Sequence, residues 1–83
     1  ITKEKLVMVE RAEDLLREQG FRQFRVRIHG TNARIELLPE DIPRMLDENI
    51  RKEIVDKLKR YGFTYITLDL EGYRTGSMNE VLV

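Results

Sequence analysis

Arginines alternate with apolar residues in one stretch of this chain, at a spacing that suits anion binding. Arg25 and Arg27 are interleaved with Phe24, Val26 and Ile28. On a β-strand, side chains two residues apart point the same way and lie roughly 6.5–7 Å from each other. Their planar guanidinium donors match a phosphate or a carboxylate. The alternative is a solvated sheet face whose charges pair across strands, and spacing alone favours that alternative.

Acidic side chains are expected on the same face. Glu36 on a second strand, with Asp69 and Glu71 on a third, could give a divalent cation the oxygen ligands that it prefers. Salt bridges to the arginines are the alternative, and the spacing favours them. Glu13, at the margin of a helical apolar stripe, is either a flanking residue or a further metal ligand.

A polar segment near the end of the chain, residues 72–77, contains Gly72, Arg74, Gly76 and Ser77. Backbone N–H groups in such glycine-containing segments can cradle an anion. The glycine spacing is not that of a Walker motif, and the Lys-Ser/Thr ending is missing. The alternative is a surface tail without a site.

Composition excludes several classes of function. Fifteen Lys and Arg balance fifteen Asp and Glu among 83 residues, which argues against sequence-independent nucleic-acid binding. The chain has no cysteine and one histidine, so it has no thiolate nucleophile, disulfide or zinc knuckle. No apolar run approaches the length of a membrane span and no signal peptide is visible, so a cytoplasmic location is the default.

The elements that position these residues follow from periodicity and breakers. Residues 3–19 predict a helix that Thr2 caps and Gly20 ends. Two alternating strands flank a turn at residues 30–32 and form a hairpin. A short helical turn is expected within 40–46, then a helix over 50–61 capped by Asp47 or Asn49, and a strand over 64–70.

The whole chain, residues 1–83, is therefore expected to be one α+β domain with the order α-β-β-α-β. We predict a two-layer sandwich in which two helices cover one face of a three-stranded antiparallel sheet. The other face is expected to be open, with Arg27 exposed to solvent. The expected core comprises Phe24, Val26, Ile28, Ile35, Ile66 and Leu68, and Leu70 is expected to face it as well.

Several runs together resemble a known family. They are Gly20-Phe21-Arg22-Gln23-Phe24-Arg25-Val26-Arg27, His29-Gly30, Ala33-Arg34-Ile35-Glu36, Leu38-Pro39 and the closing run over residues 68–80. In this order and spacing they resemble the C-terminal part of PP-loop ATPases of the ATP-dependent sacrificial sulfur transferase type, which mature the nickel-pincer cofactor of lactate racemase.

The resemblance implies a fragment of a larger enzyme. In that family an N-terminal PP-loop domain uses ATP and Mg to adenylate a carboxylate, and a cysteine donates the sulfur. This chain has neither a PP-loop nor a cysteine, so it is expected to be inactive alone, with no catalytic residue and no bound cofactor. Its expected partners are the PP-loop domain of the same chain, a nicotinic acid mononucleotide-type substrate and further copies of itself.

The family also implies roles for individual residues. Arg25 and Arg27 match an Arg-Val-Arg pair suited to the substrate phosphate, and Arg74 and Ser77 in the closing run are implied as further phosphate-binding residues. Glu36 and, through a less distinctive match, Glu13 are implied as metal ligands.

Two other classes of function remain open. One is a self-association module that uses the open face or an edge strand. The other is a small RNA-binding module, but Tyr65 is the only aromatic residue expected on the open face, and RNA-binding sheets need stacking aromatics.

Overall fold

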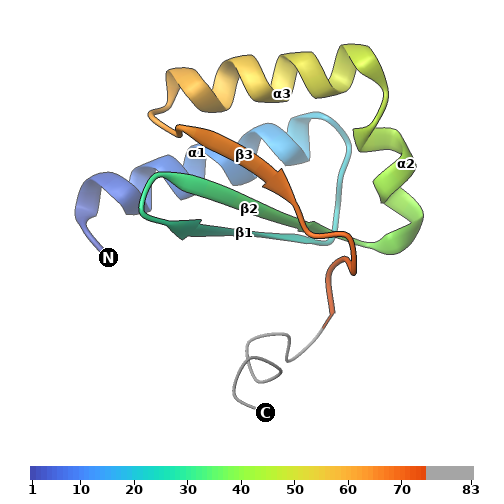
Figure 1. The fold of residues 1–83 in the computed structure, drawn as a ribbon, viewed down its shortest axis with the longest axis horizontal. Helices are drawn as coiled ribbons and strands as arrows, with labels where there is room; N and C mark the ends of the chain where they lie inside the picture. Colours follow the sequence, from blue (N-terminus) through green and yellow to red (C-terminus); the bar gives the residue numbers. More distant parts are fainter. Residues whose placement is uncertain (75–83) are drawn as a thin grey trace.

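The elements follow one another in the predicted order of helix, strand, strand, helix and strand (Figure 1). The computed structural model describes residues 1–74. The short helical turn expected between the hairpin and the last long helix is present as η1 and α2. The elements are α1 Lys3–Glu18, β1 Phe24–His29, β2 Asn32–Leu37, η1 Pro39–Asp41, α2 Ile42–Met45, α3 Glu48–Arg60 and β3 Tyr65–Leu68.

Side-chain caps define where the two long helices begin. Thr2 caps α1 as predicted, because its hydroxyl oxygen accepts a hydrogen bond from the backbone N–H of Lys5 at 3.1 Å. At α3 the carboxylate of Asp47 accepts from the N–H groups of Asn49 and Ile50 at 3.0 and 3.1 Å. Asp47 is therefore the cap, and α3 starts at Glu48, before the predicted position.

Both long helices end in the same Gly-Phe corner. Gly20 has a φ of 95°, which glycine adopts without steric cost, and the N–H of Phe21 donates to the carbonyl of Leu16 at 3.0 Å. Each corner turns the chain from a helix towards the sheet and buries its phenylalanine in the core. The equivalent residues of the second corner are Leu58, Gly62 and Phe63.

The sheet has the strand order β1-β2-β3, and it is mixed. β1 and β2 form the predicted antiparallel hairpin, with Val26 opposite Ile35. The prediction of a wholly antiparallel sheet is wrong, because β3 pairs with β2 in parallel, with Ala33 beside Ile66. The reason is that α3 carries the chain back to the end where β2 begins, which makes β2-α3-β3 a crossover connection.

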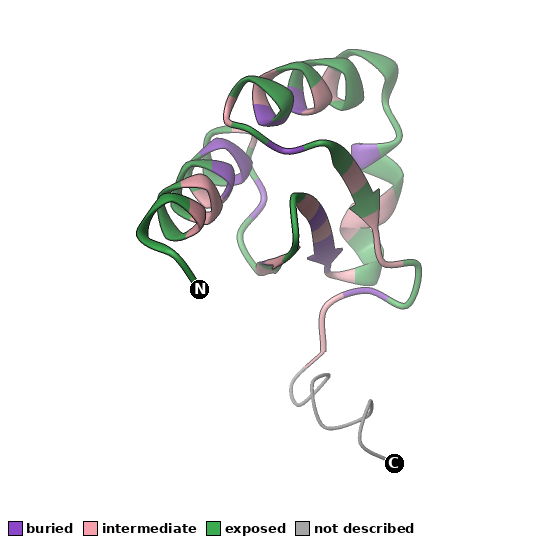
Figure 2. Ribbon diagram, turned by 60° about the vertical axis from the view of Figure 1, so that its left-hand side comes forward, coloured by how far each residue is buried: buried purple, intermediate pink, exposed green. Residues whose placement is uncertain are grey.

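The core lies between one face of the sheet and the helices α1 and α3. Figure 2 shows the buried segments of the helices turned towards the sheet. Of the predicted core, Val26 and Ile35 are buried, and Phe24, Ile28, Ile66 and Leu68 are partly buried against it. The remaining buried apolar residues are Ala12, Leu15, Leu16, Phe21, Ala33, Leu37, Met45, Ile54, Leu58 and Phe63.

The prediction for Leu70 is wrong, because this side chain is 83% exposed. β3 ends at Leu68 and the chain then turns, with the N–H of Gly72 donating to the carbonyl of Asp69 at 3.1 Å. The alternation of a strand therefore stops before it reaches Leu70.

Candidate functional site

The second face of the sheet, opposite α1 and α3, carries polar side chains in rows across the strands. The register places Arg25 opposite Glu36, Arg27 opposite Arg34 and His29 opposite Asn32. β3 adds its own alternate residues to the same face. We name two of these rows: the arginine row consists of Arg27, Arg34 and Thr67, and the hairpin row consists of His29, Asn32 and Tyr65.

A buried carboxylate holds the arginine row together. Glu36 is 0% exposed, and its Oε2 accepts from Nε of Arg27 at 3.1 Å and from an Nη of Arg34 at 2.9 Å. The prediction that Arg27 faces solvent is wrong, since its side chain retains only 14% of its exposure. Charge-assisted bonds of this kind are short and orient both guanidinium planes.

Two carboxylates accompany the two opposed arginines of the cluster. Like charges directly opposite each other on neighbouring strands destabilise a sheet, and Arg27 and Arg34 are such a pair. Glu36 compensates one of the two charges. Asp69 forms a longer ion pair of 4.0 Å with Nε of Arg34, a nitrogen that is buried and has no hydrogen-bond partner. The Arg34 side chain keeps 32% of its exposure, so an oxyanion arriving at the arginine row would meet the exposed part of an oriented guanidinium.

Arg25 lies beside the segment that follows β3. Its guanidinium is 5.6 Å from the ring centroid of Tyr73, a cation–π contact. The N–H of Tyr73 donates to the carbonyl of Leu37, which holds this segment at the end of β2. Gly72 is required here, because its φ is 88° and a Cβ atom would lie 2.7 Å from that same carbonyl oxygen.

The fold brings some of the predicted anion-binding residues close to one another. Arg25 and Arg27 share a face of β1, and Arg25 contacts the residue next to Arg74. Arg74 donates to the carbonyl of Gly72 at 2.9 Å and pairs with Glu71 at 3.4 Å. Ser77 lies outside the described residues.

Two relatives extend over almost the whole chain. One is an uncharacterized protein of Synechocystis, 49% identical over 82 residues that cover 99% of this chain and 31% of that protein. The other is the pyridinium-3,5-bisthiocarboxylic acid mononucleotide synthase of Lactiplantibacillus plantarum, 43% identical over 82 residues that cover 99% of this chain and 29% of the synthase. The resemblance predicted from the sequence is confirmed. No family model matches the chain.

The chain spans about 30% of the length of the relatives that it matches. It is therefore similar to a part of the synthase, and the remaining length of the synthase has no counterpart in this sequence. Within residues 1–74, no helix has the length and apolar character needed to cross a membrane.

The two carboxylates implied as metal ligands do not meet in this fold. Glu13 belongs to α1, on the helical side of the sheet, whereas Glu36 is enclosed on the second face by Arg27 and Arg34. In the described part of the chain, no three His, Cys, Asp or Glu side chains lie close enough to hold a metal ion. Glu13 and Glu36 therefore cannot ligate the same metal ion in this structure.

Arg34 is the site residue that sequence reasoning did not select. The signal was available in the hairpin: with the turn at residues 30–32, the register puts Arg34 directly opposite Arg27. When two arginines face each other across a hairpin and a glutamate follows two residues later, the pattern indicates that the glutamate pairs with both arginines.

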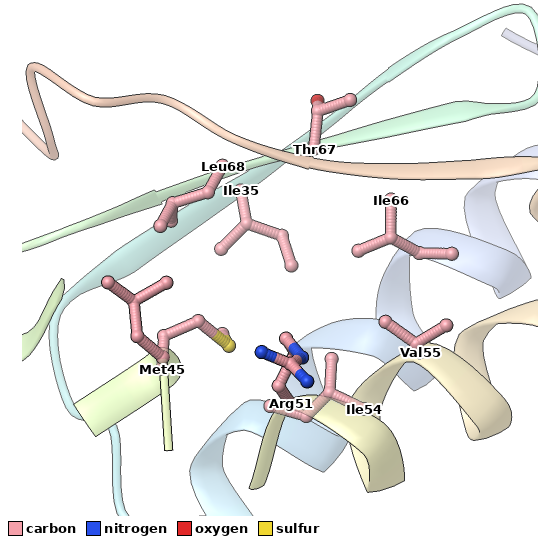
Figure 3. A pocket seen from close by; sticks show the side chains of 9 residues that line it. Ile35, Met45, Arg51, Ile54, Val55, Ile66, Thr67 and Leu68 are labelled. Carbon is pink, nitrogen blue, oxygen red and sulfur yellow. The ribbon is translucent and has the colours of Figure 1, made fainter. Parts of the chain in front are cut away.

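A separate hollow of about 170 Å³ lies between β3, α2 and α3. Figure 3 shows Ile66 and Ile35 pointing into it, Thr67 pointing away, and the guanidinium of Arg51 among the apolar side chains. The structure gives the guanidinium of Arg51 no hydrogen bond or ion pair, whereas other cations of α3 pair with acidic residues one turn away. The hollow adjoins the outer edge of β3, which is unpaired among the described strands. Its remaining lining residues are Met45, Leu46, Ile54, Val55 and Leu68.

Proposed function

We propose that this chain is the C-terminal, substrate-phosphate-binding and self-associating domain of an ATP-dependent sulfur transferase of the PP-loop type. The similarity to part of the synthase supports the enzyme class. The single observation that carries the phosphate-binding role is the pair of opposed arginines, Arg27 and Arg34, held in place by the buried Glu36.

In this proposal the substrate phosphate lies on the arginine row. Glu36 fixes the planes of Arg27 and Arg34, so the phosphate would meet donors that are already oriented. The partly exposed guanidinium of Arg34 would donate to it, and Arg25 adds positive charge from the neighbouring row. Preorganised donors lose less side-chain entropy when a ligand binds.

The chemistry at the carboxylate is assigned to the rest of the longer protein. ATP and Mg would activate that carboxylate outside this chain, and sulfur transfer would follow there. The residues of this domain bind and position the substrate through its phosphate. This division agrees with a sequence that contains no cysteine.

A titration with inorganic phosphate tests the proposal. We expect the amide signals of Arg25, Arg27 and Arg34 in a ¹H–¹⁵N spectrum to shift together, with a dissociation constant on the order of millimolar for an open site. Arg34→Lys should weaken binding about tenfold, because an ammonium cannot reproduce the oriented guanidinium donors.

Arg22→Gln is the control for this titration, because Arg22 is exposed and precedes β1. It removes one positive charge from the chain but none from the second face. If Arg34→Lys and Arg22→Gln bind phosphate equally well, the arginine row is not the site. Arg27→Ala is less informative, since it also removes a partner of the buried Glu36.

Self-association is proposed at the outer edge of β3. The occupant is a second copy of this chain, because the edge is unpaired, the adjoining hollow is apolar, and Leu46 beside it is 59% exposed. Arg51 provides a cation there for an acidic side chain of the second copy.

Sedimentation equilibrium at increasing concentration should show dimers or larger oligomers. Leu46→Glu should shift the chain to monomer, whereas Leu6→Glu should not, because Leu6 is 46% exposed on α1, away from this edge. A strict monomer, or equal loss of association in both variants, would remove self-association at this edge from the proposal.

A further inference from the structure

We propose that Tyr65 is a stacking subsite for the planar ring of a mononucleotide whose phosphate lies on the arginine row. The inference rests on the proposed phosphate-binding function and adds a specificity-determining residue to it. The ligand class is the mononucleotide already proposed, and the new element is the residue that contacts its ring.

The position of Tyr65 supports the inference. It stands opposite Asn32 in the hairpin row, next to the pair formed by Arg34 and Thr67. Neighbouring rows on one face of a strand are roughly 6.5–7 Å apart, and diagonal neighbours on adjacent strands roughly 7–8 Å. One sugar can bridge a gap of this size, so a phosphate at Arg34 would place the attached ring over the hairpin row.

The exposure of Tyr65 is the second observation. Its side chain is 68% exposed, so its ring adds little to the core. The other two tyrosines are both engaged by arginines: Tyr61 by Arg11 at 5.9 Å and Tyr73 by Arg25 at 5.6 Å. The structure records no such contact for Tyr65, so its ring face is available to a ligand.

The chemistry of the ring face gives the preference. Stacking on an aromatic side chain tolerates any flat ring. A cationic ring gains further from the negative face of tyrosine, in the same way that an arginine does. Thr67, the residue of β3 between Tyr65 and Asp69 on this face, is small and leaves the path between ring and phosphate clear.

Three probes separate the subsite from the phosphate site. Inorganic phosphate, ribose 5-phosphate and nicotinic acid mononucleotide are titrated into the parent chain and followed by amide shifts. We expect the mononucleotide to bind about tenfold more tightly than ribose 5-phosphate. Tyr65→Ser should abolish that difference and leave the affinity for phosphate unchanged, whereas Tyr65→Phe should retain it.

The outcomes are distinct. A Tyr65→Ser chain that keeps the native amide dispersion and still binds the mononucleotide like the parent overturns the subsite and leaves the phosphate site intact. Equal affinities of the parent for ribose 5-phosphate and the mononucleotide also overturn it. If inorganic phosphate shifts no signal of the arginine row, the proposed function fails, and the subsite fails with it.

Discussion

Glu36→Ala should lower the free energy of unfolding by about 3–5 kcal/mol, the usual cost of removing one partner of a buried ion pair. The substitution leaves Arg27 and Arg34 opposite each other without the carboxylate that both now share. A domain of this size has a total stability on the order of 4–12 kcal/mol. Urea denaturation followed by circular dichroism should therefore show a large decrease in the midpoint.

Two variants control this experiment. Glu71→Gln also removes a carboxylate paired with an arginine, but that side chain is 78% exposed, so stability should change by less than about 0.5 kcal/mol. The triple variant Arg27→Met, Glu36→Leu, Arg34→Leu replaces the buried charges with apolar groups and should recover most of the stability lost in Glu36→Ala. It should also lose phosphate binding, which would separate the role of the cluster in folding from its role in binding. Equal stability of the parent and Glu36→Ala would show that the cluster does not hold the fold.

Val26→Asp should prevent the chain from folding. Val26 is 6% exposed at the centre of β1, opposite Ile35, in the layer covered by α1 and α3. A carboxylate there has no partner, and a buried unpaired charge costs several kcal/mol, comparable with the whole stability of the domain. The amide spectrum should collapse to the narrow dispersion of an unfolded chain.

His29→Asp is the matched control, because His29 is on the same strand but exposed at its end. It adds the same carboxylate on the second face and should leave the amide dispersion native. A native spectrum for Val26→Asp would contradict the assignment of Val26 to the core face of β1.

Strand alternation predicted most of the fold correctly, because apolar and polar residues alternate strictly in β1 and β2. It correctly assigned Val26 and Ile35 to the core face of the sheet, and Arg27 and Glu36 to the opposite face. It could not give the direction of β3, since a strand has the same pattern read either way. That direction depends on how α3 crosses the sheet. Nor could it mark the end of β3 before Leu70, which is set by the turn at Asp69 and Gly72.

Only part of the candidate site could be predicted from the sequence. Arg25 and Arg27 follow from spacing and resemblance. The burial of Glu36 does not, because a glutamate between two apolar residues on a strand normally faces solvent. Only the register that places two arginines around it explains how the carboxylate can be buried, and the same register identifies Arg34.

Because β2 and β3 pair in parallel, the arginine cluster of the hairpin and Tyr65 of β3 come together at different stages of folding. The β1–β2 hairpin closes through a short turn, and hairpins form within about 1–10 microseconds, so Arg27, Glu36 and Arg34 can meet early. Tyr65 reaches the same face only after the chain has closed a long connection through α2 and α3, which costs more loop entropy. A fluctuation that releases β3 alone would therefore remove the aromatic platform while the opposed arginines stay paired with their carboxylate.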